Sequence, residues 1–191
     1  HESQLHRISD DIPDERAVLV EPLAGGIHAA LMAWPTVADA KEPIVAVLGA
    51  GTMGLAAIAG LRRYVPGVRI VVGARYPHQM ALAKAIGADV VVESGKLDRA
   101  VRRETGGHLV GDMLSSGAHV TIDAVGTSAS ITACVRVTRP RGRVELHGRP
   151  AEVRLDLTGL WHRETELKGA YTYGSETMPD GTTARTFDLA I

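Results

Sequence analysis

The chain has 191 residues, 45% hydrophobic and 23% charged, and its 21 basic and 22 acidic side chains leave a formal net charge of −1. This length and apolar content suffice for the core of one ordinary domain. The balanced charge provides no basic surface, so we expect no nucleic-acid partner. We find no apolar run of membrane-spanning length and no secretory leader, so we also expect no membrane partner. The single cysteine, Cys134, excludes an internal disulfide framework and favours a cytoplasmic location.

The first part of the chain lacks the pattern that dominates the rest. The stretch "DDIPDERAVLVEPLAGGIHAALMAW" predicts a turn followed by a helix that opens near Glu21 or Leu23 and stops before Pro35. We therefore separate residues 1–42, as a connecting segment, from residues 43–191, as the main domain.

From residue 43 onward, short β-branched runs alternate with helix-length segments. We predict strands at residues 44–49, 69–73, 88–93, 119–126, 143–148 and 166–172. Between them we predict helices at 52–64, 77–86 and 127–138, and a broken helical segment over 96–117. Apolar strands separated by helical crossovers are typical of a parallel sheet that is covered on both faces. The expected fold class is therefore α/β, with a doubly wound parallel sheet of six strands.

A glycine-rich loop follows the first predicted strand directly. In "VLGAGTMGL", residues Gly49, Gly51 and Gly54 form the pattern G-x-G-x-x-G at the mouth of a helix. The first glycine suits a tight turn, the second a close approach of the backbone to a pyrophosphate, and the third close helix–strand packing. Together with Ala50, Thr52 and Met53, these residues are our candidates for contacts to the phosphates at the helix N-terminus. The alternative is a glycine-rich turn without a ligand.

The end of the second predicted strand bears on the kind of dinucleotide. A loop that binds NAD is usually followed, about 20 residues on, by a carboxylate that accepts hydrogen bonds from the ribose. No Asp or Glu occurs from Leu55 through Ala88, and the strand ends in Gly73-Ala74-Arg75. Small residues and a guanidinium suit the 2′-phosphate of NADP. The alternative is that Arg75 is an ordinary surface arginine and that NAD binds through backbone and water contacts.

Several motifs now carry a family resemblance. The segments "EPLAGGIHAAL", "VLGAGTMGL", "ALAKAIGAD", "TIDAVG", "RPRGRVELHG" and "ELKGAYTYG" follow one another as in medium-chain zinc-dependent alcohol dehydrogenases. The chain resembles the branch that holds sorbitol, threonine and secondary-alcohol dehydrogenases. In NADP-dependent secondary-alcohol dehydrogenases of this family the second strand ends in Gly-Ser-Arg, which Gly73-Ala74-Arg75 resembles.

The resemblance implies a Rossmann-type fold with strand order 3-2-1-4-5-6, and hydride transfer between a small alcohol or ketone and NADP. It also implies zinc in the full-length enzyme and assembly as a homodimer or homotetramer. It adds further cofactor contacts, namely Val125, Gly126, Leu146, His147, Gly148, Ala170, Tyr171 and Thr172.

The family's catalytic domain, with its cysteine ligand and Gly-His-Glu motif, has no counterpart in this chain. We therefore interpret the chain as a cofactor domain truncated at both ends, and expect it to be inactive alone, with its catalytic residues unknown. Glu21 matches the position of the third zinc ligand, or of a carboxylate beside the metal-bound water. The alternative for Glu21 is an acid that interacts with the helix dipole.

Other functions and roles stay open at this point. The chain could belong to an NAD-dependent threonine or sorbitol-type dehydrogenase, or be a free-standing dinucleotide-sensing module. Asp123 is either a cofactor contact or a buried structural carboxylate. Cys134 is expected in the core, and Trp161, just before the last strand, is expected to be packed.

Overall fold

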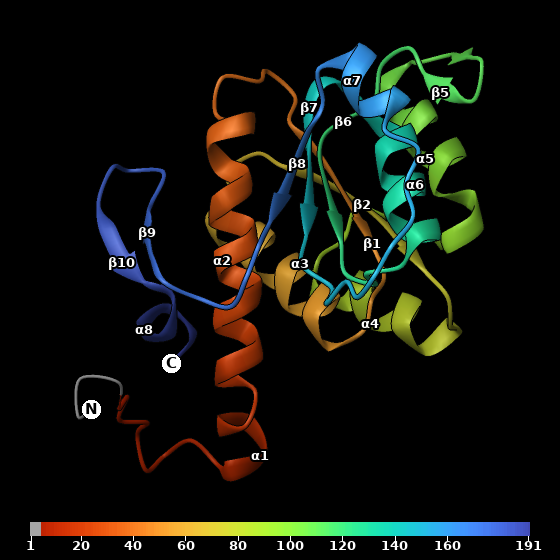
Figure 1. The fold of residues 1–191 in the computed structure, drawn as a ribbon. Coiled ribbons are helices and arrows are strands. Elements are labelled where there is room, and N and C mark those ends of the chain that lie inside the picture. The colour runs from red at the N-terminus through yellow and green to blue at the C-terminus, as the bar shows by residue number, and fades with distance from the viewer. Residues whose placement is uncertain (1–4) are drawn as a thin grey trace.

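The computed structural model describes residues 5–191, and a parallel sheet lies at its centre (Figure 1). Six strands pair in the order β3-β2-β1-β6-β7-β8. Their bounds are β1 Ile44–Leu48, β2 Arg69–Ala74, β3 Val90–Glu93, β6 Ala118–Asp123, β7 Thr138–Leu146 and β8 Glu166–Gly169. Strands β4 and β5 lie outside this sheet, so the neighbours agree with the expected 3-2-1-4-5-6 when only the sheet's own strands are numbered.

Helices cover both faces of the sheet (Figure 1). Helices α2 (Val20–Val37), α3 (Thr52–Tyr64) and α4 (Pro77–Ile86) pack on one face, and α5 (Leu97–Thr105) and α6 (Ser128–Val137) pack on the other. Strand β1 is buried throughout because Val45 and Val47 point into the first layer whereas Ala46 and Leu48 point into the second. The doubly wound architecture follows from this two-sided burial.

Helix α2 lies against α3 at very short range. A methyl group at Gly26 would overlap the backbone of Ala56, and one at Gly60 would come within 2.9 Å of the carbonyl oxygen of Gly26. Small residues at this crossing allow close packing of the backbones, so α2 belongs to the domain core and not to a separate connecting segment.

The prediction that this helix stops before Pro35 is wrong, because α2 runs through Pro35 to Val37. A proline within a helix removes one hydrogen bond to residue i−4 and crowds the carbonyl at that position, so the continuation of α2 past Pro35 needs a compensating contact. Pro35 is exposed, whereas Val37 is buried in the core cluster with Val45 and Val65. Packing of Val37 therefore keeps the last turn helical.

The predicted helical segment at 96–117 is helical only in its first half. It begins with a short 3-10 turn, η2 (Ser94–Lys96), and α5 ends where Gly106 takes a φ of +65°. The chain then forms a small hairpin of β4 (Leu109–Val110) and β5 (Met113–Leu114), with Gly111 at its turn at φ +63°. Glycine adopts left-handed backbone conformations easily, so Gly106 can end the helix and Gly111 can form the hairpin turn. The predicted helical segment did not include this hairpin.

The C-terminal part departs from the predicted sixth strand. Strand β8 ends at Gly169, and Thr172 has a φ of +56°, which ends the extended backbone. Beyond it, β9 (Ser175–Thr177), β10 (Thr183–Arg185) and α8 (Thr186–Ala190) form a small unit beside α2 (Figure 1). Two short helices complete the fold, α1 (Asp14–Ala17) before α2 and α7 (Thr158–Arg163) before β8.

The segment Asp14–Val37 is long and apolar enough to cross a bilayer by length and composition alone. Our expectation that no apolar stretch reaches this length is therefore wrong. Half of its most apolar window is buried inside the molecule, where α2 packs on α3. The core helix of a globular domain meets the same length criterion, and absence of a membrane partner stays a prediction.

Candidate nucleotide-binding crevice

The carboxyl ends of the parallel strands bring the predicted contact residues to one edge of the sheet. Strand β1 has β2 on one side and β6 on the other. The connection that follows β1 leads to β2 on one side of it, and the connection that follows β3 leads back to β6 on the other side, so the direction of winding reverses next to β1. Ligands of open α/β sheets bind at such a switch point. The sequence candidates that follow β1, β2, β6, β7 and β8 all lie at this edge.

The glycine loop has the geometry expected from its spacing. Gly49 has a φ of +96°, and its N–H donates to the carbonyl oxygen of Gly73 at 2.8 Å. A methyl group at Gly54 would overlap Gly49, so this position needs glycine for helix–strand packing. Gly51, by contrast, faces open space, which leaves room for a ligand to approach its backbone.

The N-terminus of α3 follows this loop without a side-chain cap. Gly51 is the N-cap residue and offers no oxygen to the first-turn amides. Thr52 is exposed and Met53 is half-buried, and neither comes with an acidic neighbour in the first turn. A phosphate would satisfy these N–H groups and interact favourably with the helix dipole.

Asp123 has a structural role at the end of β6. Its carboxylate is fully buried and accepts hydrogen bonds from the N–H of Val125 at 3.0 Å, the N–H of Gly126 at 3.2 Å and the hydroxyl of Ser130 at 3.0 Å. Burial raises the pKa of this carboxyl, while these three donors lower it. Asp123 therefore organises the turn at Val125 and Gly126, and its oxygens are already engaged.

The ends of β7 and β8 form the other half of the crevice. A methyl group at Gly148 would come within about 2.5 Å of the Val125 nitrogen, so the two chain segments need glycine to pass each other. Tyr171, just beyond β8, is 85% exposed, and Leu146 and Thr172 are half-buried. Exposed side chains at this edge are available to a ligand.

His147 lies buried in the same region. Its Nδ1 is 3.4 Å from the carbonyl oxygen of Ala170, and its Nε2 has no hydrogen-bond partner among the described residues. Burial lowers the pKa of this imidazole, and the nearby His28 lowers it further. A buried polar atom without a partner is unusual, and this one lies at the carboxyl ends of β7 and β8.

A carboxylate that we did not predict from the sequence, Glu93, lies near Arg75 at the end of β2. Arg75 is exposed, with its guanidinium 5.5 Å from the ring centre of Tyr76. Glu93 on β3 pairs in register with Ala74 and therefore lies one strand away from the same position. Lys96 is 2.8 Å from the Glu93 carboxylate and lowers its pKa. Glu93 is 18 residues after Arg75 in the sequence, so only the pairing of β2 with β3 shows that it lies near the end of β2.

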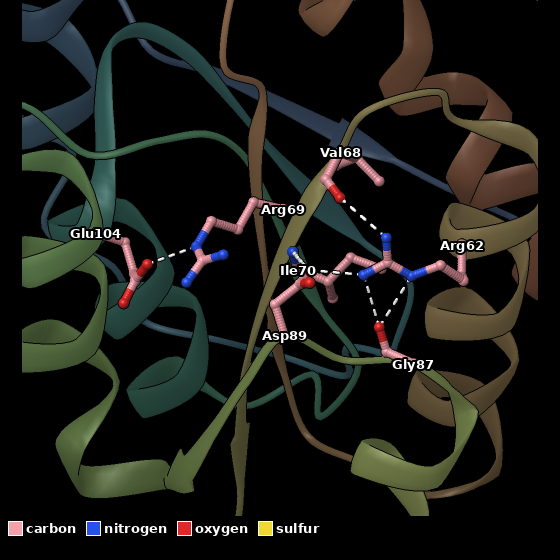
Figure 2. A network of polar contacts seen from close by, with 7 residues as sticks. All are labelled: Arg62, Val68, Arg69, Ile70, Gly87, Asp89 and Glu104. Atoms are coloured by element: carbon pink, nitrogen blue, oxygen red, sulfur yellow. Dashed lines mark hydrogen bonds and ion pairs between the residues drawn. The ribbon is translucent and has the colours of Figure 1, made fainter.

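The first carboxylate after the glycine loop, Asp89, is held elsewhere. Figure 2 shows its carboxylate between Arg62, at 2.6 Å, and the N–H of Ile70, at 2.7 Å. Arg62 also donates to the carbonyl oxygen of Gly87. This network ties α3 to the amino end of β3, away from the crevice, so Asp89 does not serve the ribose.

The candidate metal position is not supported by neighbouring ligands. Glu21 is exposed in the first turn of α2 and borders a cavity of about 570 Å³ between the N-terminal segment and the β9–β10 unit. Within residues 5–191, no three His, Cys, Asp or Glu side chains come together in a way that could hold a metal ion. A catalytic zinc needs three protein ligands, so these residues alone do not fit one.

The structure also tests the expected burial of Cys134 and Trp161. Cys134 is buried in the α5–α6 core, and burial raises the pKa of its thiol, so it is a core residue. Trp161, expected to be packed, is instead 81% exposed on α7.

The fold and the glycine loop define a Rossmann-type dinucleotide-binding domain. The profile of the family described as "Zinc-binding dehydrogenase" matches residues 52–185. The chain therefore belongs to the zinc-dependent medium-chain alcohol dehydrogenase family, as the NAD(P)-binding part of it.

One relative by sequence shares the family, and two solved structures share the fold. The chain is 30% identical to a sorbitol dehydrogenase from Macaca fascicularis over 169 residues, which is 88% of this chain and 45% of the relative. The solved structure of L-idonate 5-dehydrogenase from Escherichia coli matches with a TM-score of 0.75 at 23% identity, covering 98% of this chain and 48% of that one. A zinc-binding dehydrogenase from Sinorhizobium meliloti, solved bound to NADP, matches with a TM-score of 0.69 at 21% identity, covering 89% and 48%. The chain spans about half the length of the curated relatives it matches.

Proposed function

We propose that this chain binds NADP(H) in preference to NAD(H), as the cofactor domain of a dehydrogenase that transfers hydride between the nicotinamide and a small alcohol, polyol or ketone. The observation that carries the cofactor preference is the end of β2. Gly73 and Ala74 are buried, small residues beside an exposed Arg75, and Arg75 forms no ion pair with any carboxylate within residues 5–191. A free guanidinium at this position suits a 2′-phosphate.

The residues of this chain have distinct tasks in that proposal. The uncapped start of α3 and the open backbone at Gly51 hold the pyrophosphate. The ends of β7 and β8, with His147 and Tyr171, flank the nicotinamide half. NADP supplies the hydride chemistry when it is bound. Because the described residues do not form a zinc site, we assign no step to zinc and expect this chain alone not to oxidise alcohols.

An NAD-dependent dehydrogenase of the same family is the second candidate, and Glu93 is the observation in its favour. Glu93 pairs in register with Ala74 in the sheet and its side chain is exposed, so its carboxylate could accept hydrogen bonds from ribose hydroxyls. The salt bridge to Lys96 competes with that role.

Calorimetric titration of Arg75→Ala with NADPH and NADH tests the proposal. A charge-assisted hydrogen bond contributes roughly 1.5–3 kcal/mol, so NADPH affinity should fall by roughly 10- to 100-fold while NADH affinity stays unchanged. Arg99→Ala, at an exposed arginine on α5, is the matched control and should leave both affinities unchanged. An equal loss for both nucleotides, or no loss for either, would contradict the role of Arg75.

A further inference from the structure

A second cavity lies at the edge of the sheet opposite the nucleotide crevice. In Figure 1 the arrows of β6, β7 and β8 point away from α7 and the β4–β5 hairpin, so these two elements lie near the amino ends of the strands. The cavity has a volume of about 390 Å³ and is bounded by the hairpin, the first residues of β7 and the end of α7. Its walls combine apolar side chains, among them Val110, Met113 and Pro140, with basic ones.

Arg163 carries the main charge of this cavity. The residue is only 6% exposed, and its Nη2 donates to the carbonyl oxygen of Leu114 at 2.8 Å. Its Nη1 is buried without a partner, and no carboxylate within residues 5–191 forms an ion pair with it. A guanidinium stays protonated in proteins, and a buried charge is costly unless it is paired.

The rim of the cavity does not supply the missing counter-charge. Glu164 is the carboxylate beside Arg163, but its Oε2 accepts a hydrogen bond from Arg141 at 2.6 Å. Arg141 and Glu164 both adopt left-handed backbone conformations, with φ of 58° and 52°, which are uncommon for residues other than glycine. The cavity therefore keeps an excess of one positive charge, located on a buried side chain.

A purely structural role accounts for only part of this arrangement. A single N–H donor would suffice to tie Leu114 to α7, and a basic residue in the last turn also interacts favourably with the helix dipole. Neither role uses the unpaired Nη1, and neither supplies a counter-ion for the buried charge. An oxyanion would do both, since carboxylates and phosphates match the planar fork of a guanidinium.

We propose that this cavity is a second ligand site, which binds an oxyanion, a phosphate or a carboxylate, on Arg163 with Arg141 at its rim. The apolar wall formed by Val110, Met113 and Pro140 suits an anion carried on a small apolar body. The site is separate from the nucleotide crevice and does not depend on the proposed cofactor.

Nuclear magnetic resonance titration of the isotope-labelled chain tests this site directly. Inorganic phosphate and butyrate are added separately, replacing chloride at constant ionic strength, and backbone amide shifts are followed. We expect saturable shifts at Ser115, Arg141 and Glu164 with at least one of the two probes. Saturation by phosphate alone indicates a phosphate ester as ligand, and saturation by butyrate alone indicates an organic acid.

Variants then assign the binding to the two arginines. Arg163→Lys keeps the charge but loses the fork, and should weaken binding roughly tenfold or more. Arg141→Ala alters an exposed side chain and should weaken binding roughly two- to fivefold, which keeps the test valid if Arg163→Lys does not fold. Arg136→Ala is the control, because Arg136 is an exposed arginine paired with Asp112 outside this cavity. Shifts confined to Thr52 and Met53, shifts that never saturate, or unchanged affinity in both arginine variants would overturn the proposal.

Discussion

Arg75 and Glu93 place opposite charges near the end of β2, and we propose that their balance decides which nucleotide the crevice prefers. Arg75 is adjacent along the chain, whereas Glu93 reaches the position through strand pairing with Ala74. Lys96 offsets the charge of Glu93 at 2.8 Å. We assign the dominant role to Arg75, because it forms no ion pair with any carboxylate within residues 5–191, whereas Glu93 is paired with Lys96.

The substitution Glu93→Gln separates the two candidate cofactors. If a 2′-phosphate lies near Arg75, removal of the nearby negative charge should raise NADPH affinity roughly two- to fivefold, as expected for exposed charges. NADH affinity should not change. Calorimetric titration measures both values, and a marked loss of NADH affinity would instead support a ribose contact to Glu93.

The buried residue Glu145 should make the stability of the fold depend on pH. This carboxyl on β7 is fully buried, neither oxygen has a hydrogen-bond partner among the described residues, and burial raises its pKa to about 8. Arg143 and Lys168 lower that pKa, and Glu166 raises it. Between its ordinary pKa of 4.5 and 8, the folded state holds a proton that the unfolded state has released, so stability falls as pH rises.

We therefore expect the free energy of unfolding to decrease as the pH rises from 6.5 to 8.5. The loss is on the order of 1.4 kcal/mol for each pH unit between 6.5 and the raised pKa of Glu145. Glu145→Gln, which cannot ionise, should remove this slope. The half-buried His119 and the buried His147 have lowered pKa values, so their effect falls at more acidic pH. Denaturant unfolding at several pH values measures the slope, and identical slopes in both proteins would contradict a protonated Glu145.

At the scale of elements, the contact between α2 and α3 makes the N-terminal helix part of the domain. Gly26→Ala places a methyl group in the backbone of Ala56, and overpacking of this kind costs about 1–3 kcal/mol, more than the helix-propensity gain of alanine. Gly95→Ala is the control because that position faces open space. Denaturant midpoints of both variants give the comparison, and a neutral Gly26→Ala would show that α2 is loosely docked.

The elements that sequence reasoning predicted well are those fixed by local pattern. The apolar run of β1 and the glycines at 49, 51 and 54 define a strand, a turn and a helix without reference to distant residues. The continuation of α2 beyond Pro35 was not predictable, because it depends on the burial of Val37. The proximity of Glu93 to Arg75 likewise requires the pairing of β2 with β3.

At the scale of the whole molecule, β8 leaves one edge of the sheet unpaired within residues 5–191. All of its residues from Glu166 to Gly169 are exposed. Ala170 donates its N–H to Leu146 on β7, so by alternation the N–H of Gly169 points outward. An uncovered edge of this kind can pair with the same edge of a second copy about a twofold axis.

We predict that the chain forms a homodimer through this edge, and Gly169→Pro tests it. Proline removes the outward N–H and should shift the protein to a monomer in light scattering. Gly169→Ala is the matched control, because a methyl group there meets no neighbour. A wild-type chain that is already a monomer at tens of micromolar would contradict the prediction.

Selection of a 2′-phosphorylated nucleotide by the crevice at the carboxyl ends of β1 and β2 is our central proposal. The most direct measurement is the ratio of the dissociation constants of NADH and NADPH for the unmodified chain, obtained by calorimetry at one ionic strength. One charge-assisted contact to Arg75 predicts a ratio of roughly 10 to 100 in favour of NADPH. A ratio of one, or tighter binding of NADH, would contradict the proposed selectivity.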